Sequence, residues 1–242
     1  MKVRVFAGPN GSGKSTLIYS MENGMKLNMG FVINADDIEK QLNENKKYTF
    51  DEGLILETKQ LIKFISTSTI NKKHNLKNYT SVLSIQKNQI LLSPNSLVNS
   101  YVCAAIADFL RTVCVTQQIN FSFESVFSDF RKVQFVQKLK EAGYDIYFYF
   151  VCTINPSINI ARVHNRVLHA GHNVSEEKIK SRFQKSITNA IKAKVYTKRF
   201  FLIDNSQENN PILLLETENN NKTNFINKTF YPAWAEPFKF NN

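Results

Sequence analysis

A glycine-rich loop between a predicted strand and a predicted helix constrains the fold of this chain more than any other feature. Residues 2–7 are dense in apolar and β-branched side chains and predict a buried strand. The pattern G-x-x-x-x-G-K-[ST] then runs from Gly8 to Ser15, and a helix is expected from Lys14 to Gly24. A strand, this loop and a helix in that order are the context in which the pattern binds phosphate. The feature predicts an α/β fold of the P-loop NTPase class.

The residue types of the loop suit the phosphates of a nucleotide. Glycines let the backbone approach phosphate closely, and successive N–H groups at the positive end of a helix cradle the oxygens. Lys14 is expected to reach the β- and γ-phosphates, and Ser15 to offer its hydroxyl to Mg²⁺. An Asn-Lys-x-Asp segment, typical of guanine-specific proteins, is absent from the expected place, which favours ATP. The predicted cofactors are ATP and Mg²⁺, and the predicted nucleotide-binding residues are Gly8, Pro9, Asn10, Gly11, Ser12, Gly13, Lys14, Ser15 and Thr16.

Strands and helices alternate along the rest of the chain. This alternation predicts a mainly parallel five-stranded sheet flanked by helices, as in a small kinase with a helical lid. A long apolar helix is expected to be capped by Asn95 or Ser96. The further strands are expected at residues 30–34, 119–123, 145–152 and 199–203, and the further helices at 38–41, 51–66, 95–117, 129–142, 156–169 and 175–194.

Changes in composition suggest how the chain is divided. Residues 1–206 are expected to form a P-loop kinase-like domain. Within it, residues 44–95, rich in Asn, Lys, Ser and Thr, are expected to be an insertion, and residues 160–182 a lid. Residues 207–242 are the expected C-terminal tail. Two hairpins are expected, one from 79–85 and 89–92, and one in the tail from 212–217 and 223–229.

Carboxylates follow the second and third predicted strands. Asp36 and Asp37 come after one strand, and Glu124 ends the other. The carboxyl ends of parallel strands meet at one edge of the sheet, beside the phosphate loop. There Asp36 is favoured to accept a proton from a hydroxyl that attacks the γ-phosphate, although a helix cap is the other interpretation of an aspartate at this place. Glu124, with Asp37 and Ser125, is expected to bind the substrate; Glu124 could instead hold Mg²⁺ through water or pair with a lysine.

Two basic helices follow the fourth predicted strand. Arg162 and Arg166 are four residues apart and share a helix face, and Arg182 lies on the next helix, beyond the turn that holds His172. Planar guanidinium groups suit phosphate oxygens. A helical lid is expected to bring Arg162 and Arg166 to the transferring phosphoryl group and to exclude water, with Arg182 and His172 contacting the substrate. A charged surface pattern is the other interpretation.

Composition and charge exclude several classes of protein. A chain of 242 residues with 43% hydrophobic and 21% charged residues is globular, and no apolar run is long enough to span a membrane. The N-terminus reads as a strand rather than a signal peptide. Cys103, Cys114 and Cys152 lie in apolar contexts and predict reduced thiols in a cytoplasmic protein. A net charge of +11, gathered mainly in residues 58–107 and 162–199, favours anionic ligands, although a solvated lysine surface would also explain residues 58–107.

Several segments, taken together, resemble the zeta toxin family. The resemblance covers roughly residues 1–43 and 96–206. The phosphate loop is common to many families, whereas the spacing of the other segments is more specific. The segments are the phosphate loop, Ile-Asn-Ala-Asp-Asp-Ile at 33–38, Phe-Glu-Ser-Val at 123–126, Ala-Gly-Tyr-Asp-Ile at 142–146 and Arg-Val-His-Asn-Arg-Val-Leu-His-Ala-Gly-His-Asn-Val at 162–174.

The resemblance implies a kinase of a toxin–antitoxin system. The founding members use ATP and Mg²⁺ to phosphorylate the 3′-hydroxyl of the amino-sugar in UDP-N-acetylglucosamine. They continue the glutamate motif as Glu-Gly-Thr-Leu-Arg, whereas this chain reads Glu-Ser-Val-Phe-Ser at 124–128, which leaves the acceptor open. The residues that the resemblance implies are Lys14 and Ser15 for ATP and Mg²⁺, Asp36 as the base, Glu124 for the substrate, Arg162 near the phosphates and, with a looser match, Arg166 and His172.

The predicted function is transfer of the ATP γ-phosphate to a hydroxyl of a small anionic acceptor such as UDP-N-acetylglucosamine. Asp36, Lys14, Arg162 and Arg166 are the predicted catalytic residues. An antitoxin protein is a further candidate partner, and no membrane partner is expected. Two alternatives stay open, a kinase or ATPase that acts on nucleic acid and an ATP-binding module without a phosphoryl acceptor.

Overall fold

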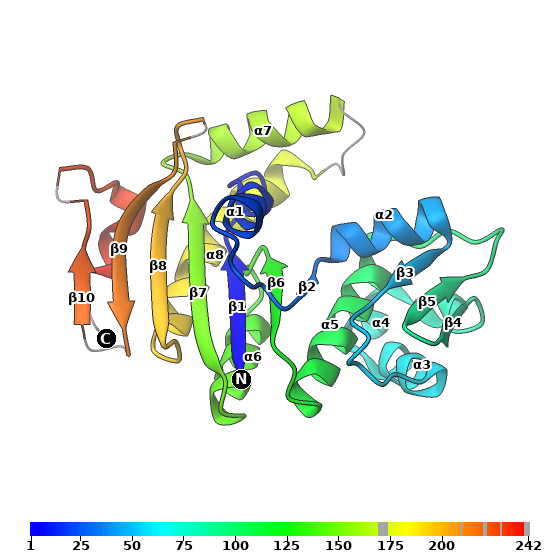
Figure 1. Cartoon of the computed structure of the whole chain (residues 1–242). Helices are drawn as coiled ribbons and strands as arrows, with labels where there is room; N and C mark the ends of the chain where they lie inside the picture. The colour runs from blue at the N-terminus through cyan, green and yellow to red at the C-terminus, as the bar shows by residue number, and fades with distance from the viewer. Residues whose placement is uncertain (169–173, 209, 220–221, 228, 240–242) are drawn as a thin grey trace. The chain divides into compact units, whose positions relative to one another are not determined.

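The computed structural model describes residues 1–168, 174–208, 210–219, 222–227 and 229–239 (Figure 1). The chain divides into two compact units. The first contains Met1–Met29 and Ser122–Asn242, and the second contains Gly30–Phe121. The predicted insertion, residues 44–95, therefore lies inside the second unit.

The first unit is built on a mainly parallel sheet with the strand order β10-β9-β8-β7-β1-β6. β1 pairs in parallel with β7, with Lys2 opposite Asp145, and β7 pairs in parallel with β8. β9 pairs antiparallel with β8, and β10 antiparallel with β9. The strands are β1 (Lys2–Ala7), β6 (Phe121–Ser125), β7 (Asp145–Cys152), β8 (Arg199–Asp204), β9 (Ile212–Glu218) and β10 (Lys222–Phe225).

The central strands are buried because their sequences are almost continuously apolar. Val5 in β1 and Phe148 and Phe150 in β7 are fully buried, as expected for strands covered on both faces. The Phe148 ring stacks on the Phe200 ring of β8 with centroids 5.3 Å apart. This packing fixes the carboxyl ends of β1, β7 and β8, where the phosphate loop and two other turns begin.

Helices cover both faces of this sheet. Figure 1 shows α8 passing behind the strands and α1 in front of them. The helix predicted at 14–24 forms as α1 followed by a π-helical turn, η1 (Ser20–Gly24). α1 spans Lys14–Tyr19, and the other helices of the first unit are α6 (Arg131–Glu141), α7 (Pro156–Leu168), α8 (Glu176–Lys194) and the 3₁₀ helix η3 (Ala233–Phe238).

The second unit combines helices with a small antiparallel sheet of order β3-β5-β4. The expected hairpin forms as β4 and β5, although its first strand begins at Leu83 rather than at residue 79, and β3 pairs with the other edge of β5. The apolar helix α5 contacts α2, α3 and α4. The elements are β2 (Phe31–Ile33), α2 (Ala35–Asn45), β3 (Lys47–Thr49), α3 (Thr58–Thr67), α4 (Thr69–His74), η2 (Leu76–Tyr79), β4 (Leu83–Gln86), β5 (Gln89–Leu92) and α5 (Ser100–Thr116).

Two helix starts in the second unit differ from the sequence prediction because other asparagines cap them. The long apolar helix begins at Ser100, where the side chain of Asn99 accepts hydrogen bonds from two backbone N–H groups. The predicted caps at 95 and 96 were wrong, because Asn43 bonds both the N–H and the carbonyl of Val98 and keeps that stretch out of the helix. The helix predicted at 38–41 begins earlier, at Ala35, with Asn34 as its cap.

Two further differences concern lengths. The helix predicted at 51–66 begins only at Thr58, and the chain continues as the separate helix α4 after Ser68. The tail predicted at 207–242 supplies two further strands of the main sheet, β9 and β10. Over the described ranges, none of the helices combines the length and the apolar character that crossing a membrane requires.

Candidate functional site

The phosphate loop lies so close to neighbouring groups that glycine is needed along it. Gly8 has φ 149°, and a Cβ there would lie 2.0 Å from the carbonyl oxygen of Val151. Gly13 has φ 93°, and a Cβ there would lie 2.1 Å from the side-chain nitrogen of Asn205. Glycine adopts such backbone angles without strain. The loop is therefore held against the ends of β7 and β8.

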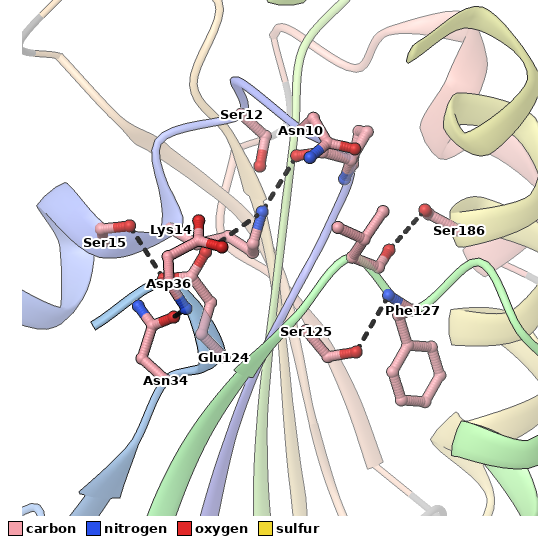
Figure 2. Close-up of polar contacts among 12 residues, drawn as sticks. Asn10, Ser12, Lys14, Ser15, Asn34, Asp36, Glu124, Ser125, Phe127 and Ser186 are labelled. Atoms are coloured by element: carbon pink, nitrogen blue, oxygen red, sulfur yellow. Dashed lines mark hydrogen bonds and ion pairs between the residues drawn. The ribbon is translucent and has the colours of Figure 1, made fainter. Parts of the chain in front are cut away.

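Lys14 and Ser15 converge on one carboxylate, that of Glu124 (Figure 2). The Lys14 ammonium lies 3.5 Å from Glu124 Oε1 and donates a hydrogen bond of 3.0 Å to the carbonyl of Pro9. The Ser15 hydroxyl donates to Glu124 Oε2 at 2.8 Å. Lys14 is only 5% exposed. The structure thus brings Glu124 to the phosphate loop, as the sequence predicted, and the lysine that pairs with it is the lysine of that loop.

Ser12 lies inside the loop and is fully buried. Its hydroxyl has no hydrogen-bond partner within the described part of the chain. A buried polar group without a partner is unusual and often marks the place of a bound ion or ligand. Figure 2 shows Ser12 and Asn10 on the turn of the loop above Lys14.

Two asparagines that sequence reasoning missed hold the loop from outside. Asn159 of α7 donates to the carbonyl of Asn10 at 2.6 Å, and Asn205 donates to the carbonyl of Ser12 at 2.8 Å. Asn205 directly follows β8, so its place at the end of a parallel strand was a signal that could have found it. Asn159 lies in the second turn of α7 and carries no local signal.

The predicted lid arginines have different surroundings. Arg162 of α7 donates to the carbonyls of Asn205 at 2.8 Å and Ser206 at 3.3 Å. Arg182 of α8 donates to the side-chain oxygen of Asn10 at 3.2 Å. Both guanidinium groups are thereby placed at the phosphate loop or at the turn beside it. Arg166 is exposed one turn further along α7.

Ser125 begins a tightly bonded turn after β6. Its carbonyl accepts a hydrogen bond from the N–H of Gly8, and its hydroxyl accepts one of 3.1 Å from the N–H of Phe127. Phe127 has φ 62°, and its carbonyl accepts a bond of 2.9 Å from Asn189 of α8. Ser186 of α8 donates to the carbonyl of Val126, as Figure 2 shows. Ser125 therefore shapes the chain behind Glu124.

The two aspartates lie in the first turn of α2, in the second unit. Both are exposed. Asn34 caps this helix, because its side-chain oxygen accepts the N–H of Asp36 at 3.0 Å. The residue that caps this helix is therefore Asn34 and neither of the two aspartates. His172, the remaining predicted site residue, lies outside the described residues.

Two cavities of the first unit adjoin these residues. One, of about 390 Å³, lies beside the phosphate loop, and its lining includes Gly13, Thr16, Leu17, Arg162, Ile203 and Asn205. The other, of about 620 Å³, is more open, and its lining includes Ser128, Phe130, Glu177, Lys178, Arg182 and Lys185. Asp129 also lines the second cavity, and its side chain is bonded to Arg131, whose guanidinium lowers the pKa of that carboxyl. Three cations, Lys178, Arg182 and Lys185, and two acids, Asp129 and Glu177, line the second cavity, so its net charge is slightly positive.

Comparisons with known proteins agree with this architecture. The family model described as Zeta toxin matches residues 84–220, more than half of the chain, and does not include the phosphate loop. A search of curated proteins found no match.

Two solved structures show the likeness of fold. A chain of the AvrRxo1-ORF1:AvrRxo1-ORF2 complex with sulphate ions is 10% identical with a TM-score of 0.54, and the match covers 94% of this chain and 61% of that one. A chain of the PezAT chromosomal toxin–antitoxin system of Streptococcus pneumoniae is 11% identical with a TM-score of 0.52, and the match covers 99% and 82%. The predicted α/β fold is confirmed, and the chain spans about three fifths of the length of the first neighbour.

Proposed function

The chain belongs to the zeta toxin family, and from that premise we propose that it is an ATP-dependent phosphotransferase. The observation that carries the proposal is the convergence of Lys14, Ser15 and Glu124 at the phosphate loop. Family members are kinases, which supports the transfer of a phosphoryl group rather than simple nucleotide binding.

The loop supplies what the phosphates of ATP need. Lys14 is aimed into the loop by its bond to Pro9, and the Ser12 hydroxyl is a buried donor that a phosphate oxygen would engage. An incoming phosphate would compete with Glu124 for Lys14. The nucleoside fits the cavity of about 390 Å³ beside the loop, between α1 and the turn after β8.

The donor atoms near Ser15 fit Mg²⁺. The Ser15 hydroxyl and the Glu124 carboxylate are hard oxygen donors 2.8 Å apart, and Mg²⁺ prefers few protein ligands together with phosphate oxygens and water. We propose that Ser15 binds the metal directly and that Glu124 holds one of its waters or the substrate. When bound, the metal neutralises charge on the β- and γ-phosphates.

Arginines supply further positive charge for the phosphates. Arg182 donates a hydrogen bond to the loop and Arg162 to the turn beside it, and phosphate oxygens are stronger acceptors for these donors. We propose that Arg162 stabilises charge on the transferring phosphoryl group, and that Arg182 contacts the substrate. Arg166 and His172 are proposed as further contacts of the closed lid.

The acceptor is proposed to be a small anionic molecule with a free hydroxyl, such as UDP-N-acetylglucosamine. The cavity of about 620 Å³ supports this, because Lys178, Arg182 and Lys185 line it together with the exposed ring of Phe130. Asp36 is proposed as the base. Its carboxylate takes the proton of the acceptor hydroxyl as that oxygen bonds to the γ-phosphorus and the bond to ADP breaks.

The proposed setting is a toxin–antitoxin pair. One of the two solved structures is a complex of AvrRxo1-ORF1 with AvrRxo1-ORF2, and the other belongs to a toxin–antitoxin system. We propose that this chain, too, has an antitoxin protein as a partner. We propose a cytoplasmic location, because the proposed reaction depends on ATP.

The test is ATP consumption with Mg²⁺ against a panel of acceptors. The panel contains UDP-N-acetylglucosamine, other sugar nucleotides and a 5′-hydroxyl oligonucleotide, and products are detected by mass. We expect a product heavier by one phosphoryl group from a sugar nucleotide. A phosphorylated oligonucleotide would instead support the nucleic-acid alternative.

Matched variants assign the base. Asp36→Asn should abolish the product, Asp37→Asn should mainly raise the KM of the acceptor, and Asp51→Asn, another acid of the second unit, should change neither. Equal slow hydrolysis by the unaltered chain and by Asp36→Asn, with no product from any acceptor, would refute both the base and the phosphotransferase.

A further inference from the structure

The segment Ala233–Phe238, close to the C-terminus, packs against the central sheet of the first unit. Ala235 and Phe238 are fully buried. The Phe238 ring lies 5.7 Å from that of Phe150 and 5.6 Å from that of Phe200, measured between centroids. Lys194 of α8 donates a hydrogen bond of 3.0 Å to the carbonyl of Phe238. Ring packing and a buried bond therefore fix this segment on β7 and β8.

Trp234 connects the segment to a buried carboxylate at the end of β8. Its indole N–H donates to Asp204 Oδ2 at 3.2 Å. Asp204 is 1% exposed and also accepts bonds from the N–H and the hydroxyl of Ser206, each at 3.0 Å. A buried carboxylate that loses one of its donors is left undersolvated, and the turn that holds it shifts to find a replacement.

The turn Asp204–Ser206 in turn holds the candidate nucleotide site. Asn205, between the two bonded residues, supports the phosphate loop through its bond to the carbonyl of Ser12. Arg162 donates to the carbonyls of Asn205 and Ser206. The Ser206 hydroxyl also accepts the N–H of Ile154 at 2.7 Å, which ties the turn to the start of α7. A displacement of this turn would move the loop, the arginine and the cavity for the nucleoside together.

We infer that Trp234 is a positioning residue for the nucleotide site and that the segment Ala233–Phe238 is a structural part of that site. The inference rests on the proposed function, because it needs ATP to bind at the phosphate loop. The bond from Trp234 to Asp204 sets the turn, and the turn sets the loop. Trp234 would act through Asp204, to which its indole N–H is bonded.

Two measurements on the full chain test the inference. Trp234 is the single tryptophan of the sequence, so intrinsic fluorescence reports on this one indole. Titration with Mg²⁺-ATP should change the intensity or the wavelength of its emission at the concentrations at which calorimetry records binding. In the second measurement, Trp234→Phe keeps an aromatic ring but removes the N–H donor, and the dissociation constant of ATP should rise about three- to tenfold. The KM for ATP should rise by the same factor, with a smaller change in kcat.

The control is Phe230→Leu, which removes an exposed ring from the same tail. It should leave the ATP dissociation constant unchanged, and thermal melts of both variants show that binding is measured on folded protein. Unaltered fluorescence during calorimetrically observed binding would overturn the inference, and so would an unchanged dissociation constant in Trp234→Phe. Absence of ATP binding to the unaltered chain would overturn the proposed function as well, so the two failures are distinguishable. Should Trp234→Phe not fold, the fluorescence titration decides alone.

Discussion

Because Lys14 and Glu124 form a buried ion pair at the phosphate loop, the costs of substituting them should not add in the free energy of unfolding. Lys14→Met removes an ammonium that lies 3.5 Å from Glu124 Oε1. Two unit charges at that separation attract by about 5 kcal/mol at an effective dielectric constant of about 20. Desolvation of both groups offsets part of this attraction, so we expect the loss of one partner to cost about 2 to 3 kcal/mol of the free energy of unfolding.

The double variant separates the pair from the packing of each side chain. In Lys14→Met combined with Glu124→Gln, neither charge remains, and the bond from Ser15 keeps an acceptor oxygen. The cost should therefore be smaller than the sum of the single costs, with a coupling of about 1 to 2 kcal/mol. Because the two side chains are only 5% and 16% exposed, the coupling should change little with salt.

Urea unfolding of the nucleotide-free protein measures all four members of this cycle. The control cycle uses Lys198 and Asp145, an ion pair with side chains 38% and 43% exposed, for which much weaker coupling is expected. Additive costs at Lys14 and Glu124, within about 0.5 kcal/mol, would refute the reasoning. Such a result would mean that the pair has no net interaction in the folded chain.

Three further perturbations have expected outcomes. Gly8→Ala places a Cβ 2.0 Å from the Val151 carbonyl oxygen, so it should lower the free energy of unfolding by about 2 to 4 kcal/mol and abolish ATP binding. A variant that unfolds in urea at the same concentration as the unaltered chain would contradict this. Burial raises the pKa of Cys114 to about 12 in the folded chain. The thiol of the unfolded chain ionises above about pH 8.5, whereas the folded one stays protonated. The free energy of unfolding therefore falls as the pH rises toward 12. Between pH 8 and 10 that loss, measured by urea unfolding, should be about 1 to 2 kcal/mol smaller in Cys114→Ala, and an equal loss in both proteins would count against the assignment. Asn34→Ala should cost about 1 kcal/mol and accelerate hydrogen exchange at the Asp36 amide, whereas unchanged exchange there would show that the cap contributes nothing.

Features set by local sequence were predictable. The phosphate loop, β7 and the helix pair at 156–168 and 176–194 follow from residue types and periodicity over short stretches, and all were expected within a residue or two. Glu124 was expected at the loop because strand ends of a parallel sheet share an edge. The sequence predicted Lys14 as a phosphate ligand and offered an unspecified lysine as a partner of Glu124, and in the structure the two are the same residue.

Features set by distant contacts were not predictable. Asn34 and Asn99 act as caps where other residues nearby looked equally suitable. At Asn99 the reason is distant, because Asn43 holds the chain at Val98 from another helix. Asn159 and Trp234 matter through bonds to residues far away in the sequence, and no periodic pattern marks them. The hairpin in the tail was expected, but not that it would extend the main sheet by pairing with β8.

The place of β1 in the sheet has a consequence for the order of events during synthesis. This strand and its phosphate loop are made before the other strands of the sheet in the first unit, and both strands beside it, β6 and β7, follow more than a hundred residues later. The loop also waits for Asn159 and Asn205 before its own carbonyls are bonded. A nascent chain therefore cannot complete the phosphate loop until these later segments have been made. Contacts of such high sequence separation also make folding slow, so the nucleotide site is among the last parts to be completed.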